Sequence, residues 1–353
     1  MSLLDQAGPV REELDLTVVD AFVKGAVPSL QGTPELEQFP GGASNLTYLL
    51  RYPERELILR RPPFGHRAKS AHDMGREATI LKTLRPAYPF VPEVLAFCDD
   101  PVVMGCDFYL MERIVGIIPR QDLPAELKLD GAQTRQLCLN VLGKLIDLHQ
   151  VDPKAAGLES LGRGEGYVRR QVEGWSDRYR RARTEDAGDF ETVMAWLAAK
   201  MPEAGIATCV IHNDFRFDNM VLDPGDPLKV IGVLDWEMAT LGDPLMDLGN
   251  ALAYWVQADD DGLFRRMRRQ PTHLPGMLTR AEVVAYYGER TGLRVENFDF
   301  YLICGLFRLA VIAQQIYYRY SQGQSKNPAF ADFIHITNYL EKRCLALIQA
   351  SSL

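Results

Sequence analysis

The chain has 353 residues, of which 47% are hydrophobic and 24% charged, and its formal net charge is −8. This length suggests two domains or one large two-lobed enzyme. The negative charge argues against a general nucleic-acid binder, because such proteins present a basic surface to phosphates. Six cysteines are scattered without a close pair at metal-ligand spacing, which predicts buried free thiols.

The same sequence features predict where the protein works. Residues 1–9 lack the basic stretch and apolar run of a secretory signal. No segment reaches the roughly 18 apolar residues that a membrane-spanning helix requires. We therefore expect a cytoplasmic protein that binds neither membranes nor nucleic acids.

The first third of the chain predicts a small sheet with one helix. Residues 46–52 and 56–60 are short runs rich in β-formers, joined by a turn. Residues 70–84 begin with a serine suited to N-capping and carry an apolar stripe, which predicts a helix. Two further strands are expected at 91–97 and 107–114.

Beyond residue 113 the pattern becomes mainly helical. An amphipathic helix is predicted at 131–150, and further helices at 163–183 (after a loop), at 189–200 and through most of the chain after 244. We therefore expect an α+β fold with two lobes. Residues 1–113 would form a small lobe with an antiparallel sheet and a helix, and residues 114–353 a larger, mainly helical lobe.

The segment Val210-Ile-His-Asn-Asp-Phe-Arg-Phe-Asp-Asn-Met-Val-Leu222 carries the strongest functional signal. Its His-x-Asp, followed by Asn five residues after the Asp, has the spacing of a protein-kinase catalytic loop. Asp214 can orient a hydroxyl as a catalytic base. Asn219 and Asp235, the latter at the end of the next apolar run, offer hard oxygen donors for magnesium. These parts move a phosphoryl group from ATP to a hydroxyl.

Two neighbouring residues are expected to support this segment rather than react. His212 would brace the loop by hydrogen bonding. Asp247 lies among apolar residues, so its burial would require a partner, and we expect it to brace the same loop. Asp and Asn also cap turns, and one such aspartate alone would favour that simpler interpretation. The combination of base and two metal ligands favours a catalytic site.

The strand-rich region offers groups for nucleotide phosphates. The glycine turn at residues 39–48 includes Gly42, Ser44 and Asn45, and exposed N–H groups in such a turn can cradle phosphates. A Gly-Gly pair also marks many simple hairpins. Arg60 and Glu77 would act like the Lys–Glu pair of kinases, with the cation on the ATP phosphates. A surface salt bridge is the alternative for this pair.

Together these motifs resemble the aminoglycoside phosphotransferase and choline-kinase-like family, over residues 35–345. The closest branch is fused to, or encoded beside, acyl-CoA dehydrogenases. The resemblance implies a protein-kinase-like fold with ATP between the lobes, backbone groups from Glu112 to Ile114 at the adenine, and Met111 behind it. The most specific segments are Gly41-Gly-Ala-Ser-Asn-Leu-Thr-Tyr48, Leu57-Ile-Leu-Arg-Arg-Pro-Pro63, Phe108-Tyr-Leu-Met-Glu-Arg113, His212-Asn-Asp-Phe-Arg-Phe-Asp-Asn219 and Leu234-Asp-Trp-Glu-Met-Ala-Thr-Leu-Gly-Asp-Pro244.

Two departures from a protein kinase bear on the substrate. Arg60 stands where a lysine is usual; it stays cationic and can be bidentate, but the exchange is not neutral. Trp236-Glu237 replaces the Phe-Gly of the kinase metal motif, and no activation loop ending in Ala-Pro-Glu follows. These differences predict a small-molecule acceptor.

An arginine-rich stretch bears on which acceptor. Residues 163–183 hold seven arginines, including Arg169, Arg170 and Arg178, against three acidic residues. In the family that the chain resembles, insertions in the second lobe form the acceptor site. An arginine-rich wall would suit an anionic acceptor such as a coenzyme A ester. Solvated helix faces are equally rich in arginine, so both interpretations stay open.

The resemblance and the motifs lead to one main hypothesis. We expect an ATP- and magnesium-dependent kinase acting on a hydroxyl of a small molecule, such as a hydroxyacyl-CoA or a related metabolite, with a functional link to an acyl-CoA dehydrogenase. The resemblance includes enzymes that phosphorylate hydroxyacyl-CoA. One alternative is an aminoglycoside-type antibiotic kinase, which would need an acidic acceptor pocket. Another is a non-catalytic nucleotide-binding module, although such a module need not keep a base.

Overall fold

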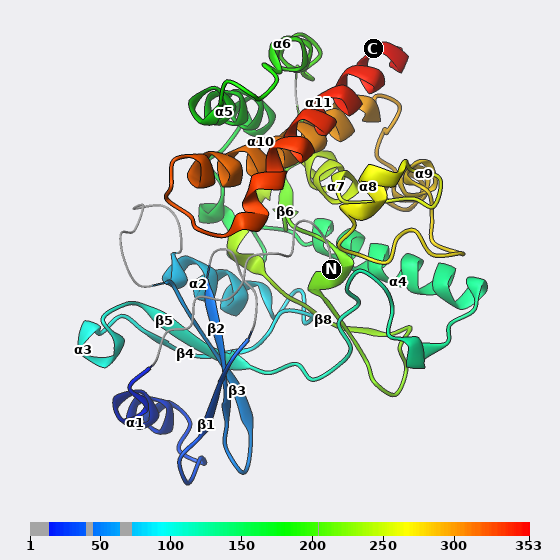
Figure 1. Cartoon of the computed structure of the whole chain (residues 1–353). Coiled ribbons are helices and arrows are strands. Elements are labelled where there is room, and N and C mark those ends of the chain that lie inside the picture. The colour runs from blue at the N-terminus through cyan, green and yellow to red at the C-terminus, as the bar shows by residue number, and fades with distance from the viewer. Residues whose placement is uncertain (1–13, 40–44, 64–72, 204) are drawn as a thin grey trace.

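A computed structural model describes residues 14–39, 45–63, 73–203 and 205–353 (Figure 1). Its first third contains a five-stranded antiparallel sheet in the order β1-β2-β3-β5-β4. The strands are β1 (Glu35–Gln38), β2 (Leu46–Arg51), β3 (Glu56–Arg61), β4 (Val94–Cys98) and β5 (Phe108–Glu112). The rest of the chain is mainly helical, which confirms the predicted α+β class. The predicted lobe boundary after residue 113 stays a prediction.

Both faces of this sheet are covered, because successive side chains of a strand point to opposite faces. On one face, helix α1 (Leu16–Ala26) packs Val19 and Val23 against the strands, near the short helix α3 (Pro101–Met104). On the other face, Leu49 and Ile58 pack with α2 (Met74–Leu84) in the core that continues into the helical region. The sequence reading did not include α1.

The helix expected at residues 70–84 begins later than predicted. Asp73, not Ser70, is its N-cap, since the Asp73 carboxylate accepts a hydrogen bond from the Arg76 N–H at 2.8 Å. Ser70 itself lies outside the described residues. The shift places Arg76 and Glu77 in the first turn of α2, next to the catalytic segments.

Eight helices and two short ladders make up the described part of the chain after β5. The helices predicted at 131–150, at 189–200 and through most of the chain after 244 are confirmed, and the catalytic segments contain short strands. The eight helices are α4 (Gly131–His149), α5 (Tyr167–Ala182), α6 (Glu191–Ala199), α7 (Pro244–Ala253), α8 (Gly262–Arg266), α9 (Arg280–Thr291), α10 (Phe298–Ser321) and α11 (Phe333–Ala350). The ladders pair β6 (Cys209–Ile211) with β9 (Thr240–Gly242) and β7 (Met220–Leu222) with β8 (Val230–Val233). Single 3₁₀ turns are η1 (Ala125–Leu127), η2 (Glu159–Leu161), η3 (Phe217–Asn219), η4 (Trp236–Met238) and η5 (Pro328–Asp332).

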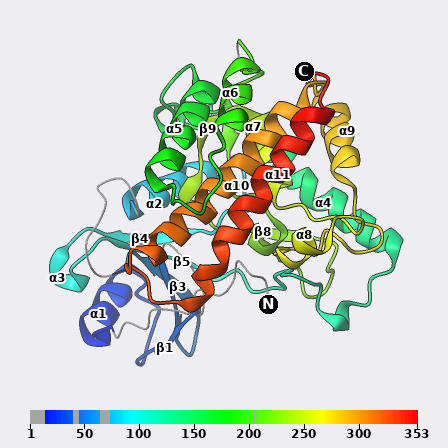
Figure 2. The same cartoon turned by 45° about the horizontal axis from the view of Figure 1, so that its top comes forward.

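Helix α10 is the centre of the helical region. It has 24 residues and a mean hydropathy of 1.5 in its most apolar window, so by length and composition it could cross a membrane. The expectation that no segment would pass this test was therefore wrong. However, 72% of that window is buried inside the protein, where α10 packs on α5, α7 and α11 (Figure 2). A helix that is apolar all round and enclosed by other helices is a core helix.

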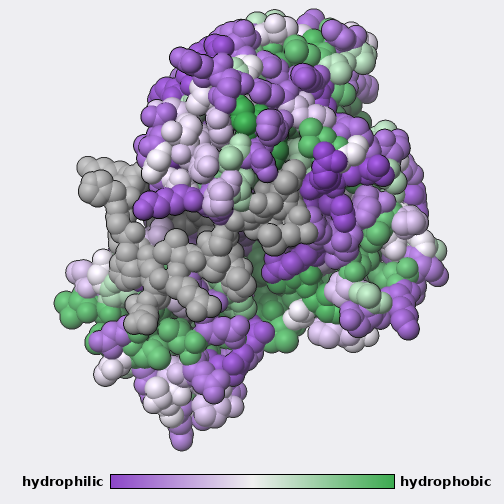
Figure 3. All heavy atoms as spheres, viewed as in Figure 1, coloured by the Kyte–Doolittle hydropathy of each residue, from purple (hydrophilic) through white to green (hydrophobic). Residues whose placement is uncertain are grey.

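The surroundings of α10 agree with this interpretation. On the face drawn in Figure 3, the helical region presents mostly hydrophilic residues with scattered apolar ones. All six cysteines are buried and unpaired, as predicted, and two of them, Cys304 and Cys344, lie on α10 and α11. These small side chains fill space in the core.

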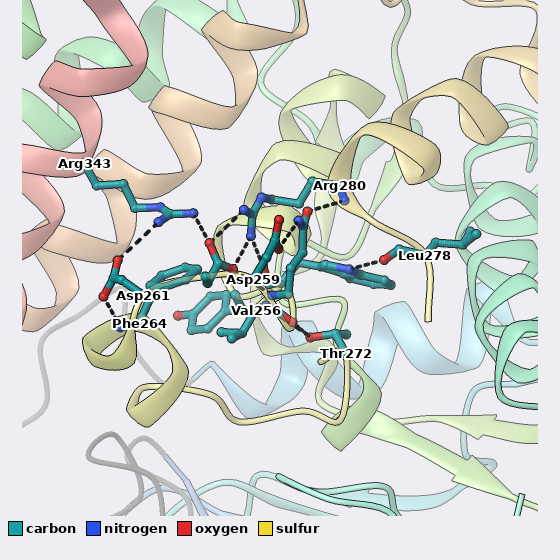
Figure 4. A network of polar contacts seen from close by, with 12 residues as sticks. Val256, Asp259, Asp261, Phe264, Thr272, Leu278, Arg280 and Arg343 are labelled. Carbon is teal, nitrogen blue, oxygen red and sulfur yellow. Dashed lines mark hydrogen bonds and ion pairs between the residues drawn. The ribbon is translucent and has the colours of Figure 1, made fainter. Parts of the chain in front are cut away.

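A buried charge network ties α8, α9 and α11 together. The Asp260 carboxylate is paired with Arg280 of α9 and with Arg343 of α11, each at 2.7 Å. Figure 4 shows Arg280 and Arg343 approaching this point from two different helices. Arg343 also lies over the Phe264 ring, 4.1 Å from its centroid. A carboxylate this deeply buried needs such partners, because an unpaired buried charge is costly.

Helices α7 and α10 cross at two glycines. A Cβ atom at Gly305 would lie 2.3 Å from the carbonyl oxygen of Gly249, and a Cβ at Gly249 would lie 2.3 Å from that of Tyr301. Backbone therefore touches backbone at this crossing, and no larger residue fits. Because α7 also carries Asp247, the crossing fixes the position of a residue beside the catalytic loop.

The close crossing gives a stability prediction. We expect Gly305→Ala to lower the free energy of unfolding by roughly 1–3 kcal/mol, because the methyl group must push α7 and α10 apart. Gly143→Ala in α4 is the matched control, since its Cβ would meet no atom within 4 Å. The control should gain about 0.5–1 kcal/mol from helix propensity. Urea denaturation of both variants measures this, and equal stability for Gly305→Ala and wild type would contradict the close crossing.

Candidate active site

The catalytic loop leaves β6 through a strained residue. Asn213 has a φ of 58°, in the left-handed region. Its side chain holds this turn: Oδ1 accepts hydrogen bonds from Tyr167 at 3.1 Å and from Asn250 at 3.2 Å, and Nδ2 donates to the Met238 carbonyl at 3.1 Å. These contacts tie the turn to α5, α7 and the segment after Asp235. Asp214 follows, with its side chain 19% exposed.

His212 is completely buried and binds three backbone or side-chain groups. Its ring Nε2 lies 3.0 Å from the Leu234 carbonyl, and its ring Nδ1 accepts a hydrogen bond from the Asp214 backbone N–H at 3.2 Å. The backbone N–H of His212 donates to the Asp247 carboxylate at 2.8 Å. This pattern fits the neutral imidazole with the proton on Nε2. Burial lowers the pKa of His212, which also favours the neutral form. His212 thus joins the two catalytic segments.

Asp247 supports the same loop from α7. Its carboxylate also accepts a hydrogen bond from His149 Nε2 of α4 at 3.0 Å, and His149 Nδ1 lies 2.7 Å from the Tyr287 hydroxyl of α9. Burial alone would raise the pKa of Asp247, but the bond from His149 and the nearby His212 outweigh it and lower that pKa. The ionised carboxylate therefore connects α4, α7 and the loop.

The side chain of Asn219 is oriented by the loop itself. Its Nδ2 donates to the Asp214 carbonyl at 2.8 Å and lies 3.3 Å from Asp214 Oδ2. Because the amide nitrogen is used in this way, the amide oxygen is directed elsewhere. No described residue donates a hydrogen bond to that oxygen. It is available to accept a metal ion.

Asp235 adopts the second left-handed conformation of the site, with a φ of 69°. Its side chain is 33% exposed, and its Oδ1 accepts a hydrogen bond from Arg60 Nη2 at 2.7 Å. Its other oxygen has no hydrogen-bond donor among the described residues. Burial would raise the pKa of Asp235, but the Arg60 charge outweighs that and lowers it, so the carboxylate is ionised.

Arg60 reaches from β3 across to these segments. Besides Asp235, its guanidinium contacts Glu237 at 3.1 Å and Glu77 at 3.5 Å. Burial would lower the pKa of Arg60, but Glu77 and Asp235 raise it well above its usual value. The pairing of Arg60 with Glu77 predicted from the sequence is present, and it is buried rather than on the surface.

Other contacts between the sheet region and the Asp235 segment were not predicted from the sequence. Asn45 donates to Glu237 at 2.9 Å, and Arg76 of α2 donates to the carbonyls of Glu237 and Ala239. Glu237 is one of the two residues that depart from the kinase metal motif, and this departure was the available signal. Its acidic side chain meets Arg60 and Asn45, where a glycine could not.

Arg216 is another residue that the sequence reading did not single out. It is buried and hydrogen-bonds to Asp214 Oδ1, and its Nε donates to Asp218 at 2.8 Å. Its guanidinium also lies over the Tyr254 ring, 4.8 Å from the centroid. Burial would lower the pKa of Arg216, but Asp214 and Asp218 raise it well above its usual value. This pairing fixes one oxygen of Asp214.

The segment after β5 has free backbone groups. No described residue hydrogen-bonds to the backbone of residues 113–115, whereas Ile117 and Leu222 exchange two bonds of 2.9 and 2.8 Å. Met111 is buried on β5, and the Glu112 carboxylate is turned to the Glu93 N–H and Arg85. Ile114 lies close to Gly232 of β8. The adenine contacts expected at Met111, Glu112 and Ile114 stay predictions. The phosphate contacts expected at Gly42 and Ser44 also stay predictions, and these two residues lie outside the described ones.

The three candidate arginines of α5 differ in their surroundings. Arg169 is exposed and 3.7 Å from Glu173, and Arg170 donates to the carbonyls of Gly164 and Glu165. Arg178 lies over the Trp175 ring, 4.5 Å from its centroid. Only Arg178 is thus without a protein oxygen as partner among the described residues.

The oxygen donors of the site suit magnesium. No group of three or more His, Cys, Asp or Glu residues at metal-binding spacing occurs among the described residues. Magnesium is usually held by one or two carboxylates together with phosphates and water, so Asn219 and Asp235 form a sufficient pair. With Asp214 nearby, the arrangement can orient a hydroxyl beside a metal-bound phosphate.

The buried neutral His212 gives a pH prediction. Unfolded His212 binds a proton below about pH 6.5, whereas the folded residue stays neutral. The free energy of unfolding should therefore fall as the pH drops below about 6.5, by up to about 1.4 kcal/mol per pH unit. His212→Gln should flatten this dependence between pH 7 and 5, and the exposed His335→Gln should not. Identical slopes for wild type and His212→Gln would contradict a depressed pKa.

Comparisons with known proteins now assign the family. A model of the phosphotransferase enzyme family (APH) matches residues 35–283. Acyl-CoA dehydrogenase family member 10 of Mus musculus is 35% identical over 324 residues, which is 90% of this chain and 30% of that protein. Member 11 of Homo sapiens is 30% identical over 321 residues, 90% of this chain and 40% of that protein. The chain thus spans less than half the length of these relatives.

Solved structures show the same fold. A candidate aminoglycoside phosphotransferase from Ralstonia eutropha superposes with a TM-score of 0.82 and 28% identity, over 97% of this chain and 100% of that one. The aminoglycoside phosphotransferase APH(4)-Ia, solved with AMP-PNP and hygromycin B, gives 0.59 and 16%, over 95% and 99%. These neighbours confirm the predicted kinase-like fold. Because the family model extends from β1 into α9, the chain belongs to the phosphotransferase enzyme family.

Proposed function

We propose that this protein transfers the γ-phosphoryl group of ATP to a hydroxyl of a small molecule and requires magnesium. The observation that carries the proposal is the arrangement of Asp214, Asn219 and Asp235 on two adjoining segments that share His212. Arg60 supports it, because it brings a positive charge from the sheet to the same place. The complex of APH(4)-Ia with AMP-PNP supports a nucleotide in this fold.

Asn219 and Asp235 would hold the magnesium ion. When bound, the metal offsets negative charge on the phosphate oxygens as the phosphoryl group moves. The amide oxygen of Asn219 and the second oxygen of Asp235 are the atoms available for it. Arg60 would then exchange part of its contact with Asp235 for the nucleotide phosphates, while Glu77 keeps the guanidinium in place.

Asp214 would act as the base. Arg216 fixes its Oδ1, and its Oδ2 lies 3.3 Å from the Asn219 amide, so the carboxylate has a defined orientation. The acceptor oxygen bonds to the γ-phosphorus, and the bond from that phosphorus to the bridging oxygen of ADP breaks. The hydroxyl proton passes to the Asp214 carboxylate. The products are ADP and a phosphate monoester.

A hydroxyacyl-CoA or related metabolite is the proposed acceptor. The relatives named as acyl-CoA dehydrogenase family members support this choice, although they match this chain over only part of their length. The positive charge on α5 also supports an anionic acceptor over a polycationic antibiotic. A functional link to an acyl-CoA dehydrogenase and a cytoplasmic location are parts of the same proposal.

The test measures magnesium-dependent ATP consumption with a panel of hydroxyacyl-CoA esters and aminoglycosides. We expect turnover of a hydroxyacyl-CoA, and Asp214→Asn should lower kcat by roughly 10²- to 10⁴-fold. ATP should still raise the Tm of Asp214→Asn, because the base is not needed for nucleotide binding. The exposed Asp226→Asn is the matched control and should keep full activity.

Two outcomes would contradict the proposal. Turnover of aminoglycosides without turnover of any hydroxyacyl-CoA would favour an antibiotic kinase. Wild type and Asp214→Asn equally inert with every acceptor, while ATP raises the Tm of both, would favour a non-catalytic nucleotide-binding module.

A further inference from the structure

Arg308, in the middle of α10, is a buried cation without an acidic partner. The residue is only 7% exposed to solvent. Among the described residues it has no ion pair and no hydrogen bond, and its one specific contact is with the Trp175 ring, 5.5 Å from the guanidinium carbon. Its nitrogens are not sealed from solvent. The guanidinium is therefore in contact with solvent, the side from which an anion would approach it.

Two other arginines of the described chain differ from Arg308 in their partners. Arg60 and Arg216 are also nearly buried, and each is paired with at least two carboxylates. An unpaired buried charge costs free energy, and hydrogen-bonded carboxylates normally offset that cost. At Arg308 no described carboxylate does so. An anion from solution would supply the missing partner.

A second arginine adds to the positive charge. Arg178 of α5 lies over the same Trp175 ring, 4.5 Å from its centroid, and likewise has no carboxylate partner among the described residues. Burial lowers the pKa of Arg178, and so do the charges of Arg181 and Arg308. Both guanidinium carbons lie within 5.5 Å of the same ring centroid, so the two positive charges repel one another, and an anion bound beside them would offset this repulsion.

Other arginines of the same helix do not join this cluster. Arg180 makes a two-point contact with Glu191, at 3.0 and 2.8 Å, on the exposed side of α5. Arg169 and Arg170 are turned to Glu173 and to backbone carbonyls, as described above. Arg169, Arg170 and Arg180 are therefore engaged elsewhere, whereas Arg178 of α5 lies beside the same ring as Arg308 of α10.

The cluster has a defined position relative to the catalytic loop. Tyr167, in the first turn of α5, donates to Asn213, the residue before Asp214. Trp175 follows eight residues later, so it lies about 12 Å farther along the helix axis. Figures 1 and 2 both show α5 next to α10. A molecule that runs along α5 from the Tyr167 contact to Trp175 would therefore have to span about this length.

We propose that Arg308, Arg178 and Trp175 form an anion-binding site for a phosphate group at the far end of the acceptor. The two guanidinium groups would donate charge-assisted hydrogen bonds to phosphate oxygens. The chemical class is a long acceptor with its hydroxyl at one end and phosphate groups at the other, as in a coenzyme A ester. The placement of the hydroxyl rests on the proposed function, whereas phosphate binding at this cluster does not require turnover.

Calorimetric titration with coenzyme A tests the site directly. The protein is first saturated with AMP-PNP and magnesium, so that the adenine nucleotide part of coenzyme A does not bind in the nucleotide cleft. We expect wild type to bind coenzyme A, and Arg308→Gln and Arg178→Gln each to weaken this binding roughly tenfold to a hundredfold. Arg180→Gln is the matched control and should bind like wild type.

Pantetheine, which lacks the phosphate groups, is the second probe. Its affinity should be the same for wild type, Arg308→Gln and Arg178→Gln. Failure of wild type to bind coenzyme A, or unchanged coenzyme A affinity in both variants, would overturn the proposal. An equal loss of affinity for pantetheine would also overturn it, because it would indicate general damage.

Urea denaturation separates binding from a structural role. Without ligand, Arg308→Gln should have a denaturation midpoint at least as high as wild type, because the variant removes an unpaired buried charge. A lower midpoint with unchanged coenzyme A affinity would assign Arg308 to the fold instead. Arg178 is exposed, so Arg178→Gln keeps the test valid even if Arg308→Gln does not fold.

The kinetic result distinguishes this site from the proposed function. If coenzyme A binding depends on Arg308 but no hydroxyacyl-CoA is phosphorylated, the anion site stands and the proposed reaction falls. If a hydroxyacyl-CoA is phosphorylated with the same KM by wild type and Arg308→Gln, the reaction stands and the anion site falls.

Discussion

The charge of the Arg60 guanidinium, held between the sheet and the catalytic segments, is the interaction on which the site depends. Arg60 lies on β3, and the carboxylates that pair with it come from α2 and from the segment after β8. Because the side chains of Arg60 and Glu77 are nearly buried, each of these two charges would be costly without a partner. The pairing therefore fixes the distance between the sheet and the segment that carries Asp235. Asn45 and Arg76 add hydrogen bonds across the same boundary.

A buried carboxylate, that of Asp247, performs the equivalent task on the helical side. Asp247 accepts hydrogen bonds from the His212 N–H and from His149, so it connects the catalytic loop to α4. The crossing of α7 with α10 at Gly249 and Gly305 sets where Asp247 can be. His212 in turn contacts the carbonyl of Leu234, the residue before Asp235, and so connects Asp247 to that segment. Asp214, the proposed base, and the segment that would hold the metal are thus located by one continuous set of contacts.

The sequence predicted the fold class and the grouping of the catalytic segments well, because both follow from local patterns. Strand and helix periodicity is local, and so is the spacing from His212 to Asn219. The contacts of Arg216 were not predicted, although it lies in the same motif, since its role depends on which carboxylates the loop brings to it. Arg308 gave no signal, because an arginine in an apolar helix is ordinary until its missing partner is known. Absence of a partner is a property of three-dimensional packing.

The difference between paired and unpaired arginines also bears on the acceptor. A polycationic acceptor would bring positive charge toward Arg178 and Arg308, where no described carboxylate offsets it. An anionic acceptor would gain there what Arg60 and Arg216 already gain from aspartates and glutamates. Because the cluster lies about 12 Å along α5 from the loop contact, this gain would come only to molecules long enough to span that length. At the proposed anion site, charge and length together would therefore favour extended phosphorylated acceptors over compact cationic alcohols.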